Sequence, residues 1–166
     1  MSRLAIIVDE NDNFIKNKDR YTLERGDIIR ISALWLENGK GEVLIAQRSI
    51  KKKHDPGLWG TAAAGTLEPG EAYEANIIKE AEEELGLTGV KLEPHKHWFF
   101  MRPDNGTGRH VQTYKAVVDW PIEKFKLQED EVDEIKWISK AELFKDVKEN
   151  RDKYTESAQN WEEIFG

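Results

Sequence analysis

The sequence predicts an α/β protein in which a mixed β-sheet carries helices on both faces. Short runs rich in β-branched and aromatic residues, separated by turn residues, recur along much of the chain. One amphipathic helix is expected in the middle of the chain, at about residues 72–85, and two more are expected near its end. Strands both before and after the central helix are typical of a sheet covered on two sides.

The first half of the chain is expected to be mostly extended. Residues 4–8 are predicted to form a short apolar strand, and the turn residues 9–12 lead to a second strand near residues 14–15. Residues 28–36 form a predicted strand, which Asn38 and Gly39 join as a hairpin turn to a partner at 42–47. A basic loop at 51–57 and an extended segment at 58–64 then lead to the central helix.

The second half continues with strands and ends with helices. Residues 97–101 and 110–118 are predicted strands joined by the turn residues 103–106, and residues 134–138 form another. Ser139 is a good N-cap for a helix at 140–148, and a last helix is expected at about 155–164. No repeat or linker divides the chain. We therefore expect one domain over residues 1–166, with a strand extension at 1–27 and C-terminal helices at 139–166.

Composition excludes several classes of function. With 166 residues, 39% hydrophobic and 34% charged, the chain is typical of a soluble globular domain. The net charge of −7 argues against a nucleic-acid polymer as partner. The absence of cysteine excludes disulfides and a thiolate nucleophile. No apolar run reaches the length of about 18 residues that spans a bilayer, and no signal-peptide pattern is present. We therefore expect no membrane partner and a cytoplasmic location.

The central helix carries a cluster of carboxylates. Glu80, Glu83 and Glu84 are three and four residues apart, so they share one side of the helix. We expect them to face outward, away from an apolar face made of Ala75, Ile78, Ala81 and Leu85. Like charges this close repel one another and raise each other's pKa, so a cation is the expected partner. Oxygen ligands suit Mg²⁺ or Mn²⁺ rather than Zn²⁺.

The segment around this helix resembles the signature of the Nudix hydrolases, G-x5-E-x7-R-E-U-x-E-E-x-G-U, in which U is a bulky aliphatic residue. The matching positions are Gly65, Glu71, Glu80, Glu83, Glu84, Gly86 and Leu87. The match departs at Lys79, where the family has arginine, and weakly at Ala81. The resemblance implies a Nudix-type α/β/α sandwich and an Mg²⁺- or Mn²⁺-dependent hydrolase of a diphosphate linkage. The alternative interpretation is a solvated acidic helix with a glycine cap.

The resemblance also implies roles for residues of the motif. The implied metal ligands are the backbone carbonyl of Gly65 and the side chains of Glu80, Glu83 and Glu84. The candidate catalytic residues are Glu83, Glu84 and the loop residue Glu131, and the choice of general base stays open. Glu71 is expected to orient the loop before the helix. Lys79 is expected to brace the glutamates more loosely than arginine, because it offers a point charge rather than two parallel hydrogen bonds.

Candidate residues outside the motif lie in two charged loops and one turn. Glu131 is the first choice within an acidic loop that also holds Glu129, Asp130 and Glu134, because an apolar residue follows it. Arg48 and Lys53 are the candidates for binding substrate phosphate, and Arg102 and Arg109 are further candidates beside a turn. The alternative interpretation of both loops is that they are simply solvated.

Two other functions stay open. Residues 47–49, 56–59 and 62–65 resemble the branch that includes isopentenyl-diphosphate isomerase, but that enzyme uses a catalytic cysteine and this chain has none. A non-catalytic ligand-binding module is the second alternative, and the intact glutamates count against it. The expected partner is therefore a small-molecule diphosphate, such as a nucleoside diphosphate derivative or a related organic diphosphate. A homodimer is possible, because relatives often form dimers.

Overall fold

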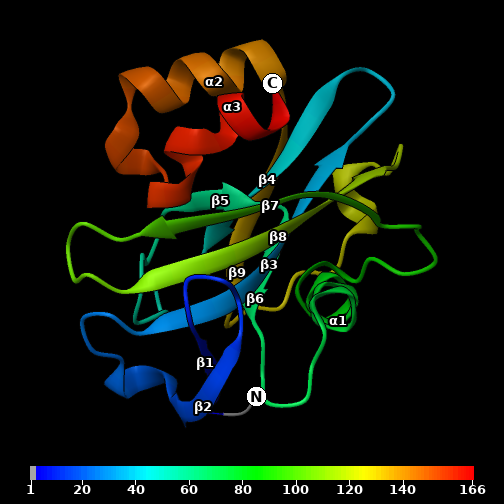
Figure 1. The fold of residues 1–166 in the computed structure, drawn as a ribbon. Helices are drawn as coiled ribbons and strands as arrows, with labels where there is room; N and C mark the ends of the chain where they lie inside the picture. The colour runs from blue at the N-terminus through cyan, green and yellow to red at the C-terminus, as the bar shows by residue number, and fades with distance from the viewer. Residues whose placement is uncertain (1–2) are drawn as a thin grey trace.

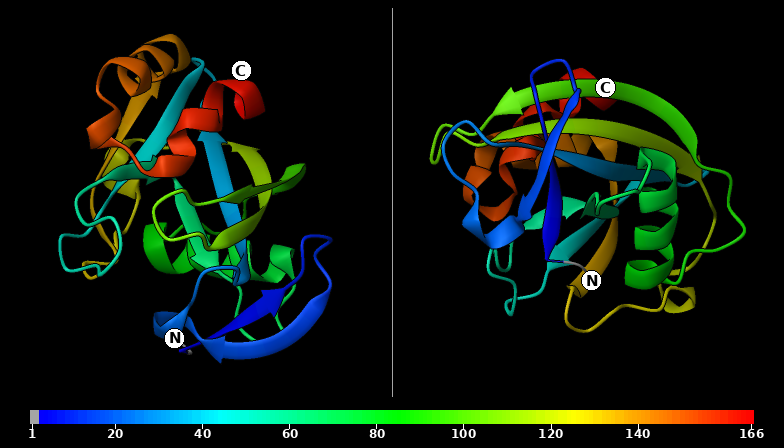
Figure 2. Two further views of the ribbon diagram at one scale, coloured as in Figure 1. Left: turned by 60° about the vertical axis from the view of Figure 1, so that its left-hand side comes forward. Right: turned by 60° about the horizontal axis from the view of Figure 1, so that its bottom comes forward.

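A computed structural model describes residues 3–166 and shows the predicted α/β architecture. Nine strands of this range form one mixed sheet. Figures 1 and 2 show α1 on one side of the sheet and α2 and α3 on the other. The helices are α1 (Tyr73–Leu85), α2 (Lys140–Glu149) and α3 (Trp161–Phe165). The strands are β1 (Leu4–Val8), β2 (Phe14–Asp19), β3 (Ile28–Glu37), β4 (Glu42–Arg48), β5 (Trp59–Thr61), β6 (Ala63–Thr66), β7 (Glu93–Met101), β8 (Gly108–Val117) and β9 (Val132–Ser139).

Strand β3 organises the sheet. It pairs antiparallel with β1, β4 and β6, and parallel with β8 along its whole length. Strand β7 pairs with the free edge of β8, and β9 pairs with β4. Because successive side chains of a strand point to opposite faces, Leu34 and Leu36 enter one core with Ile77 of α1, whereas Trp35 enters a second core with Leu143 of α2. Each helical layer thus has its own core.

Most predicted elements are present, and the last one is different. Ser139 caps α2 as expected, accepting a hydrogen bond from the Glu142 N–H at 3.2 Å. The single helix predicted at 155–164 is wrong: Glu156–Asn160 form a 3-10 helix, and α3 begins only at Trp161. Serine and asparagine in this segment are weak helix formers, which favours the tighter turn. In the described part of the chain, no helix is long and apolar enough to cross a membrane.

The apolar face predicted for α1 is wrong in part. Ile78 is 50% exposed and Ala75 is exposed, while the neighbouring Ile77 is fully buried. The buried residues of the helix are Asn76, Ile77, Ala81 and Leu85. The helix is therefore rotated from the expected orientation, and its rotation turns the side that carries Glu80 and Glu84 toward the sheet.

Replacing Phe165 tests how strongly the C-terminal helix holds the second core. Its ring stacks on Trp35 with centroids 4.0 Å apart and is 3% exposed. We expect Phe165→Ala to lower the free energy of unfolding by about 3–5 kcal/mol, because it leaves a cavity against Trp35. Urea denaturation measures this change. Phe14→Ala, at a ring that is 60% exposed, is the control and should cost no more than about 0.5 kcal/mol. Equal urea midpoints for Phe165→Ala and Phe14→Ala would show that Phe165 does not stabilise the second core.

Candidate active site

Strand β6 and helix α1 approach each other closely at Gly65. A Cβ atom at this position would lie 2.5 Å from both Cγ and Cδ of Glu80. Gly65 pairs with Ser32 of β3, and the Ser32 hydroxyl donates a hydrogen bond to Asn76 of α1. Strand β3 therefore also links β6 to α1. Any side chain here would displace the Glu80 carboxylate, which explains the glycine of the motif.

The loop between β6 and α1 is closed by Glu71. Its carboxylate accepts hydrogen bonds from the Glu68 N–H at 2.7 Å and from the Asn76 amide at 3.1 Å, and it pairs with Lys79 at 2.8 Å. Burial opposes ionisation, but the hydrogen bonds from these groups outweigh it and lower the pKa of Glu71. Lys79 also lies 3.5 Å from Glu68 and 4.0 Å from Glu80. The lysine thus bridges the loop and the helix where the motif has arginine.

Helix α1 ends directly after its carboxylates. Gly86 has a φ of 66°, in the left-handed region that favours glycine. Its N–H bonds to the Glu82 carbonyl and the Leu87 N–H bonds to the Ala81 carbonyl, which satisfies the last turn of the helix. Leu87 is then buried in the core next to the helix end. The second glycine and the aliphatic residue of the motif therefore fix where the helix stops.

The carboxylates of Glu80 and Glu84, both on α1, point toward the interior of the protein. The Oε1 atom of Glu84 is buried, and no residue of the described chain hydrogen-bonds to it. Burial, followed by the charges of Glu80 and Glu131, raises the pKa of Glu84 well above its usual value, although the Ala64 N–H opposes the shift. Burial likewise raises the pKa of Glu80 to about 7, with Glu83 and Glu131 adding to it. A buried oxygen without a partner, among other carboxylates, fits a hard divalent cation.

The three glutamates of the helix do not all face outward as expected. Glu83 is exposed, whereas Glu80 is half-buried and Glu84 turns inward. Glu131, in the loop before β9, is close enough for its charge to act on both Glu80 and Glu84. Its Oε2 atom forms an ion pair with Lys52. The structure thus brings the acidic loop to the helix, as expected for Glu131.

A cavity of about 180 Å³ lies beside these carboxylates, on the α2 and α3 side of the sheet. Glu84 and Glu131 form part of its wall, and Trp98 and Phe100 of β7 line another part. The two rings are stacked, with centroids 4.8 Å apart. Within residues 3–166, the buried Nε1 of Trp98 has no hydrogen-bond acceptor. The cavity therefore offers carboxylates at one place and aromatic rings at another.

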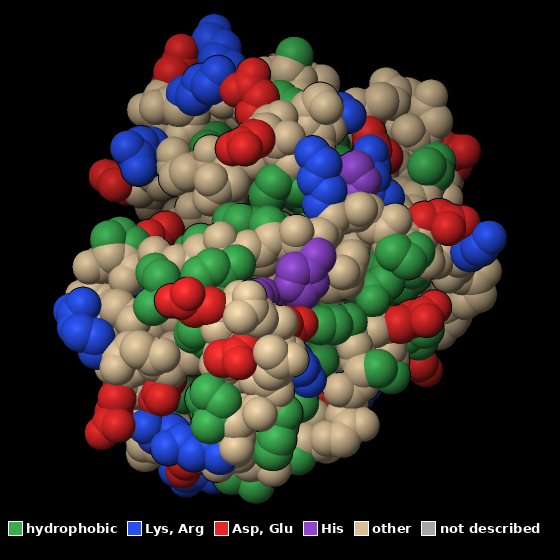
Figure 3. Space-filling model, in the orientation of Figure 1, with side chains coloured by type: hydrophobic (Ala, Val, Ile, Leu, Met, Phe, Trp, Pro, Cys, Tyr) green, Lys and Arg blue, Asp and Glu red, His purple; other side chains and the backbone are tan. Residues whose placement is uncertain are grey.

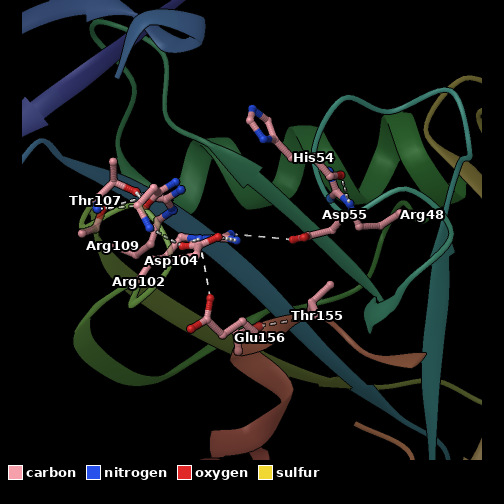
Figure 4. Close-up of polar contacts among 12 residues, drawn as sticks. Arg48, His54, Asp55, Arg102, Asp104, Thr107, Arg109, Thr155 and Glu156 are labelled. Atoms are coloured by element: carbon pink, nitrogen blue, oxygen red, sulfur yellow. Dashed lines mark hydrogen bonds and ion pairs between the residues drawn. The ribbon is translucent and has the colours of Figure 1, made fainter. Parts of the chain in front are cut away.

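Two arginines from the β7–β8 hairpin also line the cavity. Arg102 is neutralised by three carboxylates, Asp104 at 2.8 Å, Glu156 at 3.5 Å and Asp55 at 3.8 Å (Figure 4). Arg109 forms no ion pair with any described residue, and its guanidinium donates to the Thr107 hydroxyl and the Gly108 carbonyl, each at 3.0 Å. Burial and the nearby charge of Arg102 lower the pKa of Arg109 to about 10. Arg109 is therefore a partly buried cation without a direct ion pair among residues 3–166.

Of the two basic residues predicted to bind phosphate, the structure brings one to the cavity. Arg48 lines it, and its Nε donates to the His54 carbonyl at 3.0 Å. Lys53 lies elsewhere, with its ammonium 4.4 Å from the ring centre of Tyr21 in the N-terminal extension. The loop turns back so that the Gly57 N–H bonds to the Arg48 carbonyl at 3.0 Å, which leaves Lys53 on the outside of the turn.

The sequence did not single out Trp98 as a cavity residue, and it gave Arg109 only as a further candidate beside a turn. The signal that could have found them is the alternation of side chains along a strand. Trp98, Phe100 and Arg102 share one face of the hairpin, and Arg109 and Val111 share it on the partner strand. Choosing that face requires knowing which side of the sheet holds the cavity, and this depends on tertiary packing.

Comparison with known proteins shows the family to which the chain belongs. Residues 28–158 match the model of the NUDIX domain. The chain belongs to the Nudix hydrolase family. Its members are hydrolases that act on pyrophosphate bonds, so this chain is an enzyme of that class, as predicted. The predicted Nudix-type sandwich is likewise confirmed.

Three similar proteins illustrate the relationship. An uncharacterised Nudix hydrolase of Pseudomonas aeruginosa is 36% identical over 138 residues, which cover 82% of this chain and 79% of that protein. The isopentenyl-diphosphate Δ-isomerase of Aliivibrio fischeri is 26% identical over 163 residues, covering 93% and 90% of the two chains. The crystal structure of DR0079 from Deinococcus radiodurans superposes with a TM-score of 0.83 at 18% identity, covering 98% and 99%, and shows the same fold.

Replacing Gly65 tests whether the close approach of β6 holds the metal ligands. We expect Gly65→Ala to displace Glu80 and to weaken Mn²⁺ binding, with a loss of turnover of about 100-fold, because misplacement of a reacting group by an ångström has this effect. Calorimetric titration with Mn²⁺ and activity measurements check this expectation. Gly60→Ala is the matched control, since its Cβ would meet Thr155 at an ordinary contact of 3.6 Å. Unchanged Mn²⁺ affinity in Gly65→Ala would show that the close approach of Gly65 to Glu80 is not needed for metal binding.

Proposed function

We propose that this Nudix hydrolase uses Mg²⁺, or Mn²⁺, to cleave the diphosphate linkage of a nucleoside diphosphate derivative or a related organic diphosphate. The observation that carries the proposal is one shared cavity: the partly buried carboxylates of Glu84 and Glu131 and the guanidinium of Arg109, which has no ion pair among residues 3–166, all line it. A cation bound by the carboxylates and the free arginine together supply positive charge for two phosphoryl groups. The partner is thus a small molecule, in keeping with the net charge of −7.

The helix and its loop would hold the cation. The proposed ligands are the Gly65 carbonyl, Glu80, Glu83 and Glu84. Gly65 lies against Glu80, the charge of Glu80 acts on Glu84, and the Oε1 atom of Glu84 lacks a partner among residues 3–166. When bound, the ion would lower the pKa of a water molecule and neutralise phosphoryl oxygens. Glu131 stands near Glu80 and Glu84 on a separate loop, where Lys52 orients its carboxylate. Glu83, Glu84 and Glu131 are therefore the proposed catalytic groups, and Glu71 and Lys79 position the loop.

The rest of the cavity would bind the remainder of the substrate. Arg109 and Arg48 are placed to contact phosphate oxygens, whereas the charge of Arg102 is already satisfied by carboxylates. Trp98 and Phe100 line the cavity with stacked aromatic rings. A flat group such as a nucleobase can pack on such rings.

The similarity to an isopentenyl-diphosphate isomerase makes that reaction the second candidate. Its catalytic cysteine is missing, because this chain has no cysteine at all. The residue directly before Gly65 is Ala64, whose N–H bonds to Glu84 and whose side chain carries no proton donor. Hydrolysis therefore remains the proposed reaction.

A diphosphate panel with Glu84→Gln beside the parent protein tests the hydrolase directly. The panel holds nucleoside triphosphates, ADP-ribose, dinucleotides, and isopentenyl and geranyl diphosphates, and the readout is Mg²⁺- or Mn²⁺-dependent release of phosphate or pyrophosphate. We expect turnover of a nucleotide substrate, with a loss of at least about 100-fold in Glu84→Gln. Glu82→Gln, an exposed glutamate on the same helix, is the matched control and should stay active. Metal-dependent turnover that survives Glu84→Gln would refute the proposal.

The unpaired arginine gives a second, independent test. We expect Arg109→Gln to raise KM by about 10- to 100-fold, because charge-assisted hydrogen bonds contribute roughly 1.5–3 kcal/mol each. The effect on kcat should be smaller, since Arg109 lies apart from the carboxylate cluster. Steady-state kinetics on the best substrate of the panel measures both. Arg151→Gln, at an exposed arginine, is the control. An unchanged kcat/KM in Arg109→Gln would show that the cavity does not bind phosphate there.

A further inference from the structure

A second cluster of metal-ligating side chains lies outside the active-site cavity. Asp12, in the turn between β1 and β2, His97 of β7 and His110 of β8 each place one ligand atom within 4.8 Å of the others. Figure 3 shows histidine side chains at the surface near the middle of this face of the molecule. The neighbours Trp98 and Arg109 line the cavity, so strand alternation directs the histidines to the opposite face of the sheet. The two sites are therefore separate.

The distances within the cluster suit a small metal ion. His97 Nε2 lies 3.0 Å from His110 Nδ1 and 3.8 Å from Asp12 Oδ2. A tetrahedral ion with bonds of about 2.0–2.1 Å separates its ligand atoms by about 3.3 Å. The observed separations lie on either side of that value. All three ligand atoms lie within 4.8 Å of one another, so small side-chain movements would bring them onto one ion.

The ring of His110 is already oriented as a ligand. Its Nε2 lies 3.1 Å from the carbonyl oxygen of Asp9, which can only accept, so Nε2 carries the hydrogen and Nδ1 keeps a lone pair directed at His97. Metal-bound histidines commonly donate their second N–H to a carbonyl in this way. His97 would bind through Nε2 with its hydrogen moved to Nδ1. Its side chain is 37% exposed, so water can carry that proton from one ring nitrogen to the other.

Asp12 is held by two further groups. The Tyr73 hydroxyl donates to Oδ2 at 2.9 Å, and the Arg30 Nε donates to Oδ1 at 2.7 Å. Its backbone adopts a left-handed φ of 64°, and its N–H bonds to the Asp9 carbonyl at 3.0 Å. The carboxylate oxygen nearest His97 is thus fixed by partners that leave it a free lone pair. Such outer hydrogen bonds are typical of a metal site.

We infer that Asp12, His97 and His110 form a site for a first-row transition ion of the zinc type, with solvent completing the coordination. Two imidazole nitrogens and one carboxylate suit Zn²⁺, whereas Mg²⁺ prefers an all-oxygen site such as the active site. The ligands come from the N-terminal hairpin and from the β7–β8 ribbon, which lie far apart in the chain (Figure 1). The ion would fasten the hairpin to the sheet, a function separate from diphosphate hydrolysis.

Zinc titration of the full-length protein tests the inference. After treatment with a chelator, the protein is titrated with Zn²⁺ alone, and both stoichiometry and melting temperature are recorded. We expect one Zn²⁺ ion that raises the melting temperature, equally in the parent protein and in Glu84→Gln. His97→Ala should weaken this binding at least about tenfold, and Tyr73→Phe about tenfold, the usual loss when an outer hydrogen bond to a ligand is removed.

The matched control is His95→Ala. This imidazole lies two residues earlier on the same strand, and its Nε2 contacts the Ile164 carbonyl at 2.8 Å, away from the cluster. It should leave zinc affinity unchanged, and long-range ¹H–¹⁵N spectra should show Zn²⁺ shifting the Nδ1 resonance of His110. Failure of the parent protein to bind Zn²⁺, or parental affinity in His97→Ala, would overturn the site. Loss of the bound ion in Glu84→Gln would instead assign it to the active site and would equally overturn the inference.

Discussion

The structure depends on the burial of carboxylates where β6 meets α1. The Oε1 atom of Glu84 is buried without a partner among residues 3–166, and Glu80 and Glu131 stand close enough to raise the pKa of Glu84. Burying charge without a partner is unfavourable, so this arrangement persists only because the surrounding fold holds it. Gly65 permits the approach of the strand, and the rotation of α1 turns Glu84 inward. The unfavourable electrostatics of this carboxylate cluster support the proposal that the site takes a divalent cation.

The stability that offsets this burial resides in the two cores on either side of the sheet. One packs Leu34 and Leu36 against α1, and the other packs Trp35 against α2 and α3. Since β3 contributes to both cores through alternate residues, it fixes the position of β6 relative to both layers. The same alternation on β7 and β8 assigns the aromatic and arginine side chains to the cavity and the histidines to the opposite face. The sheet thus separates two chemically different sites carried by the same strands.

Local spacing explains what could be predicted from the sequence. The strands, the central helix and the glycine at its end follow from periodicity and capping, which act over a few residues. The rotation of α1 could not be predicted, because Ile77 and Ile78 are adjacent and either can define an apolar face. The usual rule that carboxylates face water then favoured the wrong choice. Lys53 and Arg109 depend on how distant loops fold back, and this information does not lie in their own segments.

Lys79 stands where the motif has arginine, and its contacts show how the loop before α1 is held without that residue. Arginine commits its planar fork to one carboxylate, whereas an ammonium is a point charge that several oxygens can share. Lys79 lies 2.8 Å from Glu71, 3.5 Å from Glu68 and 4.0 Å from Glu80, so it acts on the loop and on the helix together. These contacts tie the loop between β6 and α1 to the helix. A link between loop and helix is therefore present at the position where the motif has arginine, and whether it is looser than an arginine link stays a prediction.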